Sequence, residues 1–247
     1  MSAVAKPAVV FDHVSKTFGS KQVLRDISFE VPAGETLCIL GRSGTGKSVT
    51  LKLLISLIKP DQGKIWVDQE EITHLEESDL SRVRRKMGFL FQDAALFDSM
   101  TLYENLAIPL KRLTSKTRYE IDSAIDKVLC QVGLKGDKSK MPAALSGGMR
   151  KRAGLARALV LEPKILLADE PSSGLDRITA TEIDELLIQQ KVEHHTTVIV
   201  VTHDVHGARR IGDRFAVFDK SELIAFGPAA EVESSEHETA RRLISEH

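Results

Sequence analysis

The chain has 247 residues, of which 42% are hydrophobic and 28% are charged, and its formal net charge is −1. This composition is typical of a globular protein with a substantial core, and the near-zero charge argues against nucleic acid as a partner. The longest apolar runs, such as 198–201, are only strand-sized. The sequence therefore predicts no membrane-spanning helix, and its N-terminal residues do not have the pattern of a signal peptide.

The first 92 residues are rich in predicted strands. Apolar patterns indicate strands at 9–14, 28–31 and 36–40, with Gly-Ser-Lys as a turn after the first. A Gly-rich loop and an amphipathic helix at 49–58 follow, and the Lys-Pro pair at 59–60 ends that helix. A turn at Gly63 then leads into another strand.

From about residue 93 the pattern becomes helical. Helices are predicted at 103–113, 116–134 and 148–163, with Gly133 and Gly136 as stop signals.

Strands return in the last third of the chain. Continuous apolar runs at 164–170 and 196–203 are typical of parallel strands buried on both faces. A helix at 179–192 separates them, a hairpin follows at 215–227, and the polar tail contains a short helix. We therefore predict one α/β domain over 1–247, with a catalytic core at 1–92 and 158–247 and a helical insertion at 93–157.

The two cysteines and one pair of histidines are not expected to take part in catalysis or metal binding. Cys38 and Cys130 stand far apart in apolar surroundings, so we expect buried thiols in a reducing compartment rather than a disulfide or a metal site. His194 and His195 lie in a polar connection and are expected at the surface.

The stretch "GRSGTGKS" fits the phosphate-loop pattern G-x-x-x-x-G-K-[ST], and it stands between a predicted strand and a helix as that motif requires. Glycines let backbone N–H groups turn toward phosphate oxygens, Lys47 neutralises the β- and γ-phosphates, and the Ser48 hydroxyl ligates Mg²⁺. The predicted ATP-binding residues are Gly41, Arg42, Ser43, Gly44, Thr45, Gly46, Lys47, Ser48 and Val49.

Two carboxylates follow the apolar strand "ILLAD". Asp169 is expected in the Mg²⁺ shell, and Glu170 is expected to orient or deprotonate an attacking water, because phosphoryl transfer to water needs a positioned nucleophile. An apolar strand that ends in Asp-Glu is common by itself. Its position after a phosphate loop favours the catalytic interpretation.

His203 and Gln92 are two further candidates. His203 ends a buried strand, where an imidazole can donate to a γ-phosphate, although a lone histidine is more often structural. Gln92 lies at the join between core and insertion and can reach Mg²⁺ or the attacking water without adding charge. Considered alone, it reads as a solvated loop residue.

A second anion cradle is predicted in "ALSGGMRKRAGLARAL", where a Ser and two Gly precede a basic helix. Considered without the other motifs, this stretch could equally be an ordinary helix start. The stretch "SSGLD" after the carboxylates, considered in the same way, is a plain turn.

Taken together, these motifs resemble the nucleotide-binding subunits of ATP-binding-cassette (ABC) transporters over nearly the whole chain. The resemblance implies the ABC variant of the P-loop NTPase fold, with a RecA-like, mostly parallel core, an antiparallel β subdomain and a helical subdomain. It implies catalytic Gln92, Glu170 and His203, and an adenine-stacking Phe18. The signature is Leu145, Ser146, Gly147, Gly148 and Met149, the D-loop is Ser173, Gly174, Leu175 and Asp176, and the Mg²⁺ residues are Ser48, Gln92 and Asp169.

The same resemblance implies activity and partners. Members hydrolyse ATP with Mg²⁺ to drive transport, and two copies pair head to tail so that each signature contacts ATP held by the other copy. A membrane permease is the second implied partner.

A narrower resemblance is carried by "FQDAALF" at 91–97 and "SGGM" at 146–149, which are similar to the MlaF-like ATPases of Mla/Mce-type lipid transporters. It implies lipid transport, phospholipid in particular, across or between bacterial membranes, with a substrate-binding Mce-type subunit. The location implied is the cytoplasmic face of the inner membrane, reached through the permease. Two residues depart from the commonest pattern of the wider family: Met149 replaces Gln, and Arg177 replaces Pro.

Other functions stay open at this point. A different importer or a cell-division-type complex would use the same motifs. A cassette that acts on DNA or ribosomes is disfavoured, because the chain has one motif set, no long coiled-coil insertion and little net charge. Residues 95–106 are expected either to face the permease or to form the core of the helical insertion.

Overall fold

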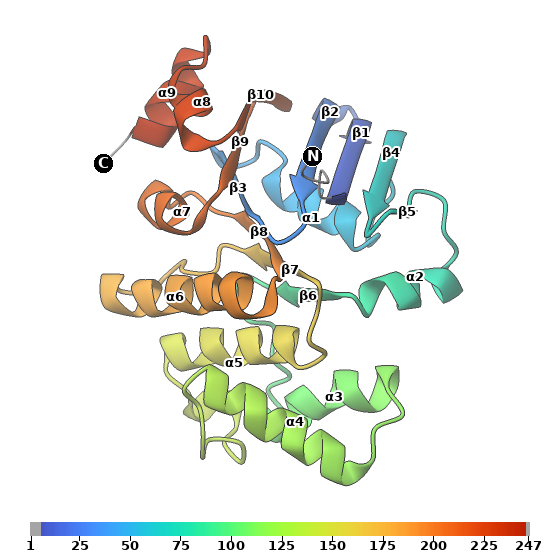
Figure 1. Cartoon of the computed structure of the whole chain (residues 1–247), viewed down its shortest axis with the longest axis vertical. Coiled ribbons are helices and arrows are strands. Elements are labelled where there is room, and N and C mark those ends of the chain that lie inside the picture. Colours follow the sequence, from blue (N-terminus) through green and yellow to red (C-terminus); the bar gives the residue numbers. More distant parts are fainter. Residues whose placement is uncertain (1–5, 246–247) are drawn as a thin grey trace, which may run out of the picture.

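The computed structural model describes residues 6–245. Figure 1 shows two β-sheets with helices around them and a separate group of helices at the opposite end of the molecule. The strands are β1 (Pro7–Phe18), β2 (Lys21–Pro32), β3 (Thr36–Gly41), β4 (Gln62–Val67), β5 (Glu70–Glu71), β6 (Met87–Leu90), β7 (Ile165–Asp169), β8 (Thr197–Val201), β9 (Arg214–Asp219) and β10 (Glu222–Gly227). The helices are α1 (Lys47–Leu54), α2 (Glu77–Arg84), α3 (Leu102–Leu113), α4 (Arg118–Gln131), α5 (Gly147–Leu159), α6 (Arg177–His194), α7 (Val205–Ile211), α8 (Ala229–Glu233) and α9 (Glu238–Ser245), and a 3₁₀ turn lies at Pro142–Ala144.

The central sheet has the strand order β10–β9–β3–β8–β7–β6. Strands β9, β3, β8, β7 and β6 pair in parallel, whereas β10 pairs antiparallel with β9. Strands β3 and β8 are buried along their whole length, as their unbroken apolar sequences predict. The carboxyl ends of β3, β7 and β8 therefore meet at the edge where open α/β sheets bind ligands.

The second sheet is antiparallel, with the order β2–β1–β4–β5. Its inner face packs into a core that also includes side chains of α1 and the central sheet. Phe11 of β1 stacks on Phe29 of β2, with ring centroids 4.6 Å apart. Strands β1 and β2 each have 12 residues, more than predicted, because their polar ends pair across the hairpin where the sequence has no apolar alternation.

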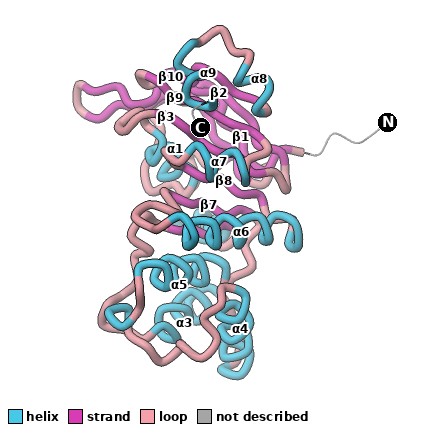
Figure 2. Tube along the Cα trace, turned by 90° about the vertical axis from the view of Figure 1, so that its left-hand side faces the viewer, coloured by secondary structure: helices cyan, strands magenta, loops and turns pink. Residues whose placement is uncertain are grey.

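Helices α3, α4 and α5 form the separate group seen in Figures 1 and 2. Thr101 and Thr117 begin α3 and α4 with capping boxes, which satisfy free N–H groups at each start. Gly133 (φ 68°) follows the end of α4, so the predicted stop signal is confirmed. All three predicted helices of this region are present.

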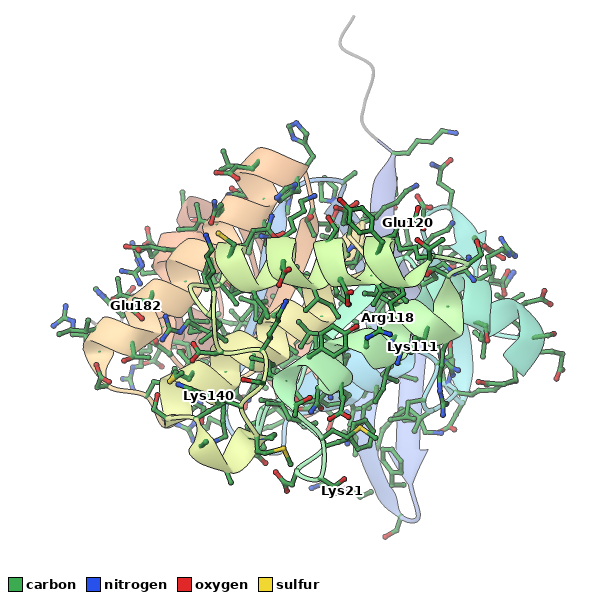
Figure 3. All side chains as sticks on the ribbon, turned by 90° about the horizontal axis from the view of Figure 1, so that it is seen from below. Lys21, Lys111, Arg118, Glu120, Lys140 and Glu182 are labelled. Carbon is green, nitrogen blue, oxygen red and sulfur yellow. The ribbon has the colours of Figure 1, made fainter. Side chains whose placement is uncertain are left out.

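Charged side chains cover the outside of this helical group. Figure 3, seen from below, labels Lys111 on α3 and Arg118 and Glu120 on α4, and all three residues are exposed. The inner sides of α3 and α4 carry the fully buried Leu106 and Ile125. Each helix therefore has one apolar face that packs inward and one polar face in solvent.

Several sequence predictions need correction. Helix α1 ends at Leu54 instead of continuing to the Lys-Pro pair, because Ser56 has a left-handed φ of 52° and Arg84 donates hydrogen bonds to the Ile55 and Ser56 carbonyls. Helices α2, α7 and α8 and strand β6 were not predicted. Each is short, so its apolar residues show little periodicity.

The two cysteines have different surroundings. Cys38 is fully buried in β3, and burial strongly raises the pKa of its thiol. Cys130 is exposed on α4, so its predicted burial was wrong. The buried residues just before it, Val128 and Leu129, occupy the inward face of the helix. His194 and His195 are exposed, as predicted.

The C-terminal elements agree with the predictions where they are described. Strands β9 and β10 form the expected hairpin, and α9 is the expected short helix. The first five residues of the N-terminal segment and the last two of the tail lie outside the described part of the chain. No helix within 6–245 combines the length and apolar character needed to cross a bilayer.

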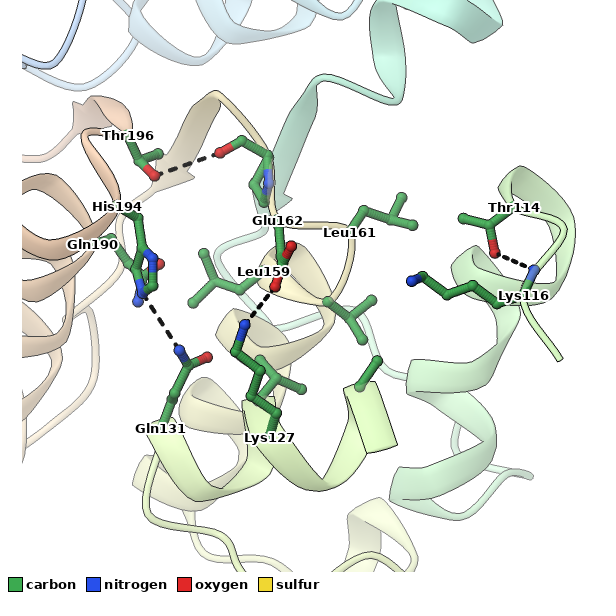
Figure 4. Close-up of a pocket in the computed structure, with 14 residues that line it drawn as sticks. Thr114, Lys116, Lys127, Gln131, Leu159, Leu161, Glu162, Gln190, His194 and Thr196 are labelled. Atoms are coloured by element: carbon green, nitrogen blue, oxygen red, sulfur yellow. Dashed lines mark hydrogen bonds and ion pairs between the residues drawn. The ribbon is translucent and has the colours of Figure 1, made fainter. Parts of the chain in front are cut away.

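A cavity of about 380 Å³ lies where the helical group meets the core (Figure 4). Lys127 of α4 pairs with Glu162 at 2.6 Å, and the side chain of Gln131 lies 3.4 Å from that of His194. These contacts join α4 to the segment after α5 and to the end of α6. The cavity shares no lining residue with the phosphate loop, so we assign it no part in nucleotide chemistry.

Candidate functional site

The phosphate loop connects β3 to α1, and its backbone requires glycine. Gly44 and Gly46 have φ values of 80° and 103°, a conformation that L side chains rarely adopt. A Cβ at Gly46 would also lie 2.6 Å from Leu24 Cδ2 and 2.7 Å from the Val23 carbonyl oxygen. Strand β2 therefore runs directly over the loop, and the glycines allow that close approach.

Lys47 is held against the loop it belongs to. Its Nζ donates to the carbonyl oxygens of Gly41 (2.7 Å) and Arg42 (3.0 Å), and the residue is only 7% exposed. Burial lowers the pKa of the Lys47 ammonium, while the carboxylates of Glu170 and Asp169 act in the opposite direction. The positive charge is therefore placed inside the loop, where a phosphate chain would lie.

Ser48 and Asp169 meet across the ends of α1 and β7. Ser48 Oγ donates to Asp169 Oδ1 at 3.0 Å. Burial raises the pKa of Asp169, the Ser48 hydrogen bond opposes this, and the neighbouring Glu170 carboxylate raises it further. A hydroxyl and a carboxylate are hard oxygen ligands of the kind Mg²⁺ prefers, so this pair fits the predicted metal position.

Glu170 follows β7 in a left-handed backbone conformation, with φ 49°. Its N–H donates to the Val201 carbonyl at 2.8 Å, and its Oε2 lies 2.8 Å from Nδ1 of His203. The Glu170 side chain is 14% exposed, against 70% for His203. The structure thus brings together two residues that are 33 positions apart in the chain.

A cavity of about 600 Å³ is lined by many of the predicted nucleotide-site residues, but its lining does not include Phe18, Gly41, Arg42, Thr45 and Asp169. Gln92, Glu170 and His203 line it together with the phosphate loop. The complete lining is Lys21, Val23, Ser43, Gly44, Gly46, Lys47, Ser48, Val49, Gln92, Glu170 and His203. The sequence analysis missed Lys21 and Val23, because no motif marks them and only the course of β2 over the loop brings them there.

Phe18 stands at the end of the β1–β2 hairpin, beside this cavity. It pairs across the hairpin with Lys21, which lines the cavity, and it is 47% exposed. Lys16 Nζ lies 5.4 Å from the centre of its ring. An exposed ring in this place can offer a face to a base.

The second anion cradle lies apart from the first: residues 145–149 are not among the lining of the phosphate-loop cavity. Ser146 caps α5, its Oγ accepting from the Met149 N–H at 3.2 Å, and both Ser146 and Gly147 are exposed. A Cβ at Gly148 would overlap the Cγ2 methyl of Thr179. Met149 is partly buried and packs against the hydrophobic core. Within one chain, therefore, this cradle is not part of the phosphate-loop cavity.

Residues 173–176 lie between the two cradles. Ser173, Gly174 and Leu175 line a second cavity, of about 670 Å³, that also touches Glu170 and His203. Asp176 begins α6, and its Oδ1 accepts from the backbone N–H groups two and three residues later. The turn therefore joins Glu170 to a helix start.

The structure adds one contact that the motifs did not indicate. Lys151, in the basic run after the second cradle, donates from Nζ to the carbonyl oxygen of Glu170 at 2.8 Å.

A family model described as "ABC transporter" matches residues 24–173. The fold is similar to that of the ATP-binding cassette MJ0796, solved as a dimer in a post-hydrolysis state with ADP and Pi, with a TM-score of 0.83 and 32% identity over 89% of this chain and 98% of that one. It is also similar to cbiO1 of Clostridium perfringens, part of the transporter complex cbiONQ, with a TM-score of 0.84 and 29% identity over 96% and 94% of the two chains. The predicted fold is therefore confirmed.

Curated relatives carry differing transport descriptions. A probable ribonucleotide transport ATP-binding protein, mkl, of Mycobacterium leprae is 42% identical over 96% of this chain and 69% of its own length. The protein of the same description in Mycobacterium tuberculosis is also 42% identical, and the chain covers 65% of it. The methionine import ATP-binding protein MetN of Xanthomonas campestris is 38% identical over 95% of this chain and 70% of its own length.

Proposed function

The chain belongs to the ABC transporter family, and from this premise we propose that it is the ATP-hydrolysing subunit of a transporter that moves lipid, phospholipid in particular, across or between bacterial membranes. The membership itself makes it an ATPase that uses ATP and Mg²⁺ to drive transport. We propose, in addition, the lipid substrate, the roles of single residues and the partners.

ATP is proposed to bind in the phosphate-loop cavity. The loop N–H groups and Lys47 would bind the β- and γ-phosphates, as the buried ammonium and the glycine backbone favour. Adenine would stack on the exposed ring of Phe18. Ser48, Asp169 and Gln92 would hold Mg²⁺, which supplies neutralisation of phosphate charge when bound.

Glu170 is proposed as the residue that takes a proton from the attacking water. Its carboxylate is mostly buried, lines the same cavity as Lys47, and is oriented by the contact to His203. Gln92 would position the water through its amide, and His203 would donate to the γ-phosphate. In-line attack by water on the γ-phosphorus then releases ADP and phosphate, with positioning and electrostatics as the main contributions.

Two copies are proposed to pair head to tail, with each ATP lying between the phosphate loop of one and Leu145–Met149 of the other. Support comes from the position of Ser146 and Gly147, which are exposed and absent from the lining of their own chain's phosphate-loop cavity. The start of α5 offers free N–H groups and a positive dipole end to a phosphate. Residues 173–176 would lie at the same interface.

The lipid assignment rests on one observation, the combination of "FQDAALF" at 91–97 with Met149 in the signature. Met149 packs against the hydrophobic core instead of offering an amide to solvent, and this combination resembles the Mla/Mce group. The relatives described for ribonucleotide transport and methionine import support a second candidate, an importer of another solute.

The permease is proposed to contact the segment around Gln92. Residues 95–106 divide in two: Leu102 and Leu106 are fully buried in the helical group, whereas Phe97 is 52% exposed, and Phe91 just before the segment is 39% exposed. The two exposed phenylalanines are the proposed contact surface: Phe97 lies within the helical subdomain, for which we keep the bounds 93–157, and Phe91 lies just before it. Binding there would place the chain on the cytoplasmic face of the inner membrane, with a substrate-binding Mce-type subunit in the same complex.

Identification of co-purifying membrane proteins tests this proposal. The full-length chain, tagged and extracted in mild detergent, is expected to bring down a permease and an Mce-type subunit, and the complex is expected to bind phospholipid. Phe97→Asp should abolish this capture without changing basal ATP hydrolysis. Capture of an amino-acid importer would favour the second candidate, and capture of a cell-division protein would overturn the lipid assignment.

A further inference from the structure

Lys151 connects the helix of the second cradle to the proposed catalytic carboxylate. It lies on the second turn of α5, is 6% exposed, and donates from Nζ to the Glu170 carbonyl oxygen at 2.8 Å. This is the only hydrogen bond recorded for its side chain within residues 6–245. A buried ammonium with a single backbone partner is a costly arrangement, so it calls for an explanation other than helix packing.

The backbone at Glu170 supplies one part of that explanation. Its φ of 49° lies in the left-handed region, which is unfavourable for an L residue and persists only where neighbours hold it. The Glu170 N–H is held by the Val201 carbonyl. Its carbonyl oxygen accepts from Lys151 Nζ at 2.8 Å and from the Ser173 N–H at 3.2 Å, so contacts on both sides fix the two peptide planes around the residue, and Lys151 supplies the shorter bond to the carbonyl.

Charge supplies the other part. Burial lowers the pKa of the Lys151 ammonium, and the carboxylates of Asp93, Glu170 and Asp169 raise it. Asp93 directly follows Gln92. Lys151 therefore lies among carboxylates from both the catalytic strand end and the segment that leads to the helical group.

We propose that Lys151 is a positioning residue, whose ammonium holds the Glu170 backbone in the conformation that aims the carboxylate at the attacking water. This rests on the proposed role of Glu170. Because Lys151 belongs to α5, the same bond makes the aim of Glu170 depend on where the signature helix lies. A displacement of α5 away from the core breaks the bond and disables the base without moving the phosphate loop.

Steady-state hydrolysis by the purified full-length chain tests the inference. Lys151→Met, which keeps length but removes the charge, is expected to lower kcat at least tenfold with little change in KM, since misplacement of a catalytic group by about 1 Å costs on the order of 100-fold. Lys151→Arg should restore most of the rate, because a guanidinium can reach the same carbonyl. Lys127→Met is the control: this exposed lysine of α4 pairs with Glu162, neither residue lines the phosphate-loop cavity, and the variant should leave kcat unchanged. Should Lys151→Met not fold, Lys151→Gln is measured in its place.

The Glu170→Gln background separates positioning from structural damage. If Lys151 acts through the Glu170 carboxylate, Lys151→Met should leave the residual single-turnover rate of Glu170→Gln unchanged. Wild-type kcat in Lys151→Met would overturn the inference, and so would an equal loss in the Glu170→Gln background. Full turnover in Glu170→Gln alone would instead overturn the proposed base, so the two failures are distinguishable.

Discussion

Glu170 Oε2 lies 2.8 Å from His203 Nδ1, and this contact follows from the strand order. Glu170 comes directly after β7, and His203 stands two residues past β8, its parallel neighbour. The proposed base and the proposed γ-phosphate contact therefore belong to one hydrogen-bonded pair. The backbone N–H of His203 also donates to Glu170 Oε2 at 3.4 Å, so loss of the imidazole weakens the hold on the carboxylate without removing it, and the effects of the two side chains are interdependent.

Replacement of the proposed base should separate binding from hydrolysis. Glu170→Gln keeps the shape but cannot take a proton, and general bases contribute about 10²–10⁴-fold, so a loss of at least about 100-fold in kcat is expected. ATP should then persist and stabilise a dimer visible by size-exclusion chromatography. A monomeric variant with full turnover would show that Glu170 is not the base.

Removal of the loop ammonium should act on binding itself. Lys47→Ala deletes a buried charge that would contact the phosphates, and hydrogen bonds to charged groups contribute about 1.5–3 kcal/mol. ATP affinity, measured by equilibrium binding of labelled nucleotide, should fall at least about tenfold. Lys52→Ala, a lysine on the exposed side of α1, is the control, and near-normal binding by Lys47→Ala would contradict the assigned phosphate site.

Mixed dimers test the proposed trans arrangement. Lys47→Ala disables one phosphate loop, and Ser146→Arg blocks one signature. In a dimer of the two variants, one composite site loses both elements and the other keeps both, so the mixture should hydrolyse ATP faster than either variant alone. A mixed dimer that forms, as shown by differently tagged chains, but hydrolyses no better than its parents would argue for sites completed within one chain.

Gly148 is expected to affect the stability of the fold as well as nucleotide binding. A Cβ at Gly148 would overlap the Cγ2 methyl of Thr179. The Thr179 side chain is held in place because its hydroxyl donates to Asp176. Overpacking of this kind costs about 1–3 kcal/mol. Gly148→Ala should therefore lower the free energy of unfolding in urea by about 1 kcal/mol, after the helix propensity gain of alanine.

Two variants control that prediction. Gly147→Ala places its Cβ 3.9 Å from Leu175, an ordinary contact, and should not destabilise the chain. Thr179→Ser removes the obstructing methyl and keeps the hydroxyl, so it should rescue Gly148→Ala. Equal stability loss at both glycines would mean that the Thr179 contact is not the cause.

The ionised carboxylate of Asp68 is expected to make the free energy of unfolding depend on pH. Hydrogen bonds from Lys86 (2.7 Å) and Lys164 (3.1 Å) lower the pKa of Asp68 below its ordinary 3.8. Because the pKa of Asp68 is lower in the folded chain than in the unfolded chain, the ionised carboxylate stabilises the fold at pH values above its ordinary pKa. That stabilisation is lost as the pH falls through the folded-state pKa. Asp68→Asn, which tolerates the φ of 49°, should cost about 1 kcal/mol at pH 7.

The difference between wild type and Asp68→Asn in urea unfolding should vanish in acid, once the wild-type carboxyl is protonated. It should also shrink in high salt, because the three side chains are partly exposed. A difference that is constant across pH would assign the effect to the shape of the turn instead of the charge.

Much of the candidate nucleotide site could be located from the sequence, because its residues form short local motifs. The phosphate loop, the Asp169–Glu170 pair and the strand before His203 each lie next to an apolar strand, and parallel strands bring their carboxyl ends to one edge. Short elements were missed, among them β6 and α7, because so few residues show little periodicity. The burial of Cys130 was predicted wrongly, because surrounding apolar residues do not show which face of a helix a side chain occupies.

By itself, the sequence determined the order of the longer strands and helices, the glycine backbone of the phosphate loop and the residue types expected to bind phosphate and magnesium. These depend on local periodicity and on spacing along the chain. Only the tertiary structure decided that Lys21 and Val23 join the nucleotide cavity, that Thr179 requires glycine at 148, and that Lys151 holds Glu170. Each of these contacts joins residues on different elements, and the packing of those elements against one another sets a distance that no local pattern records.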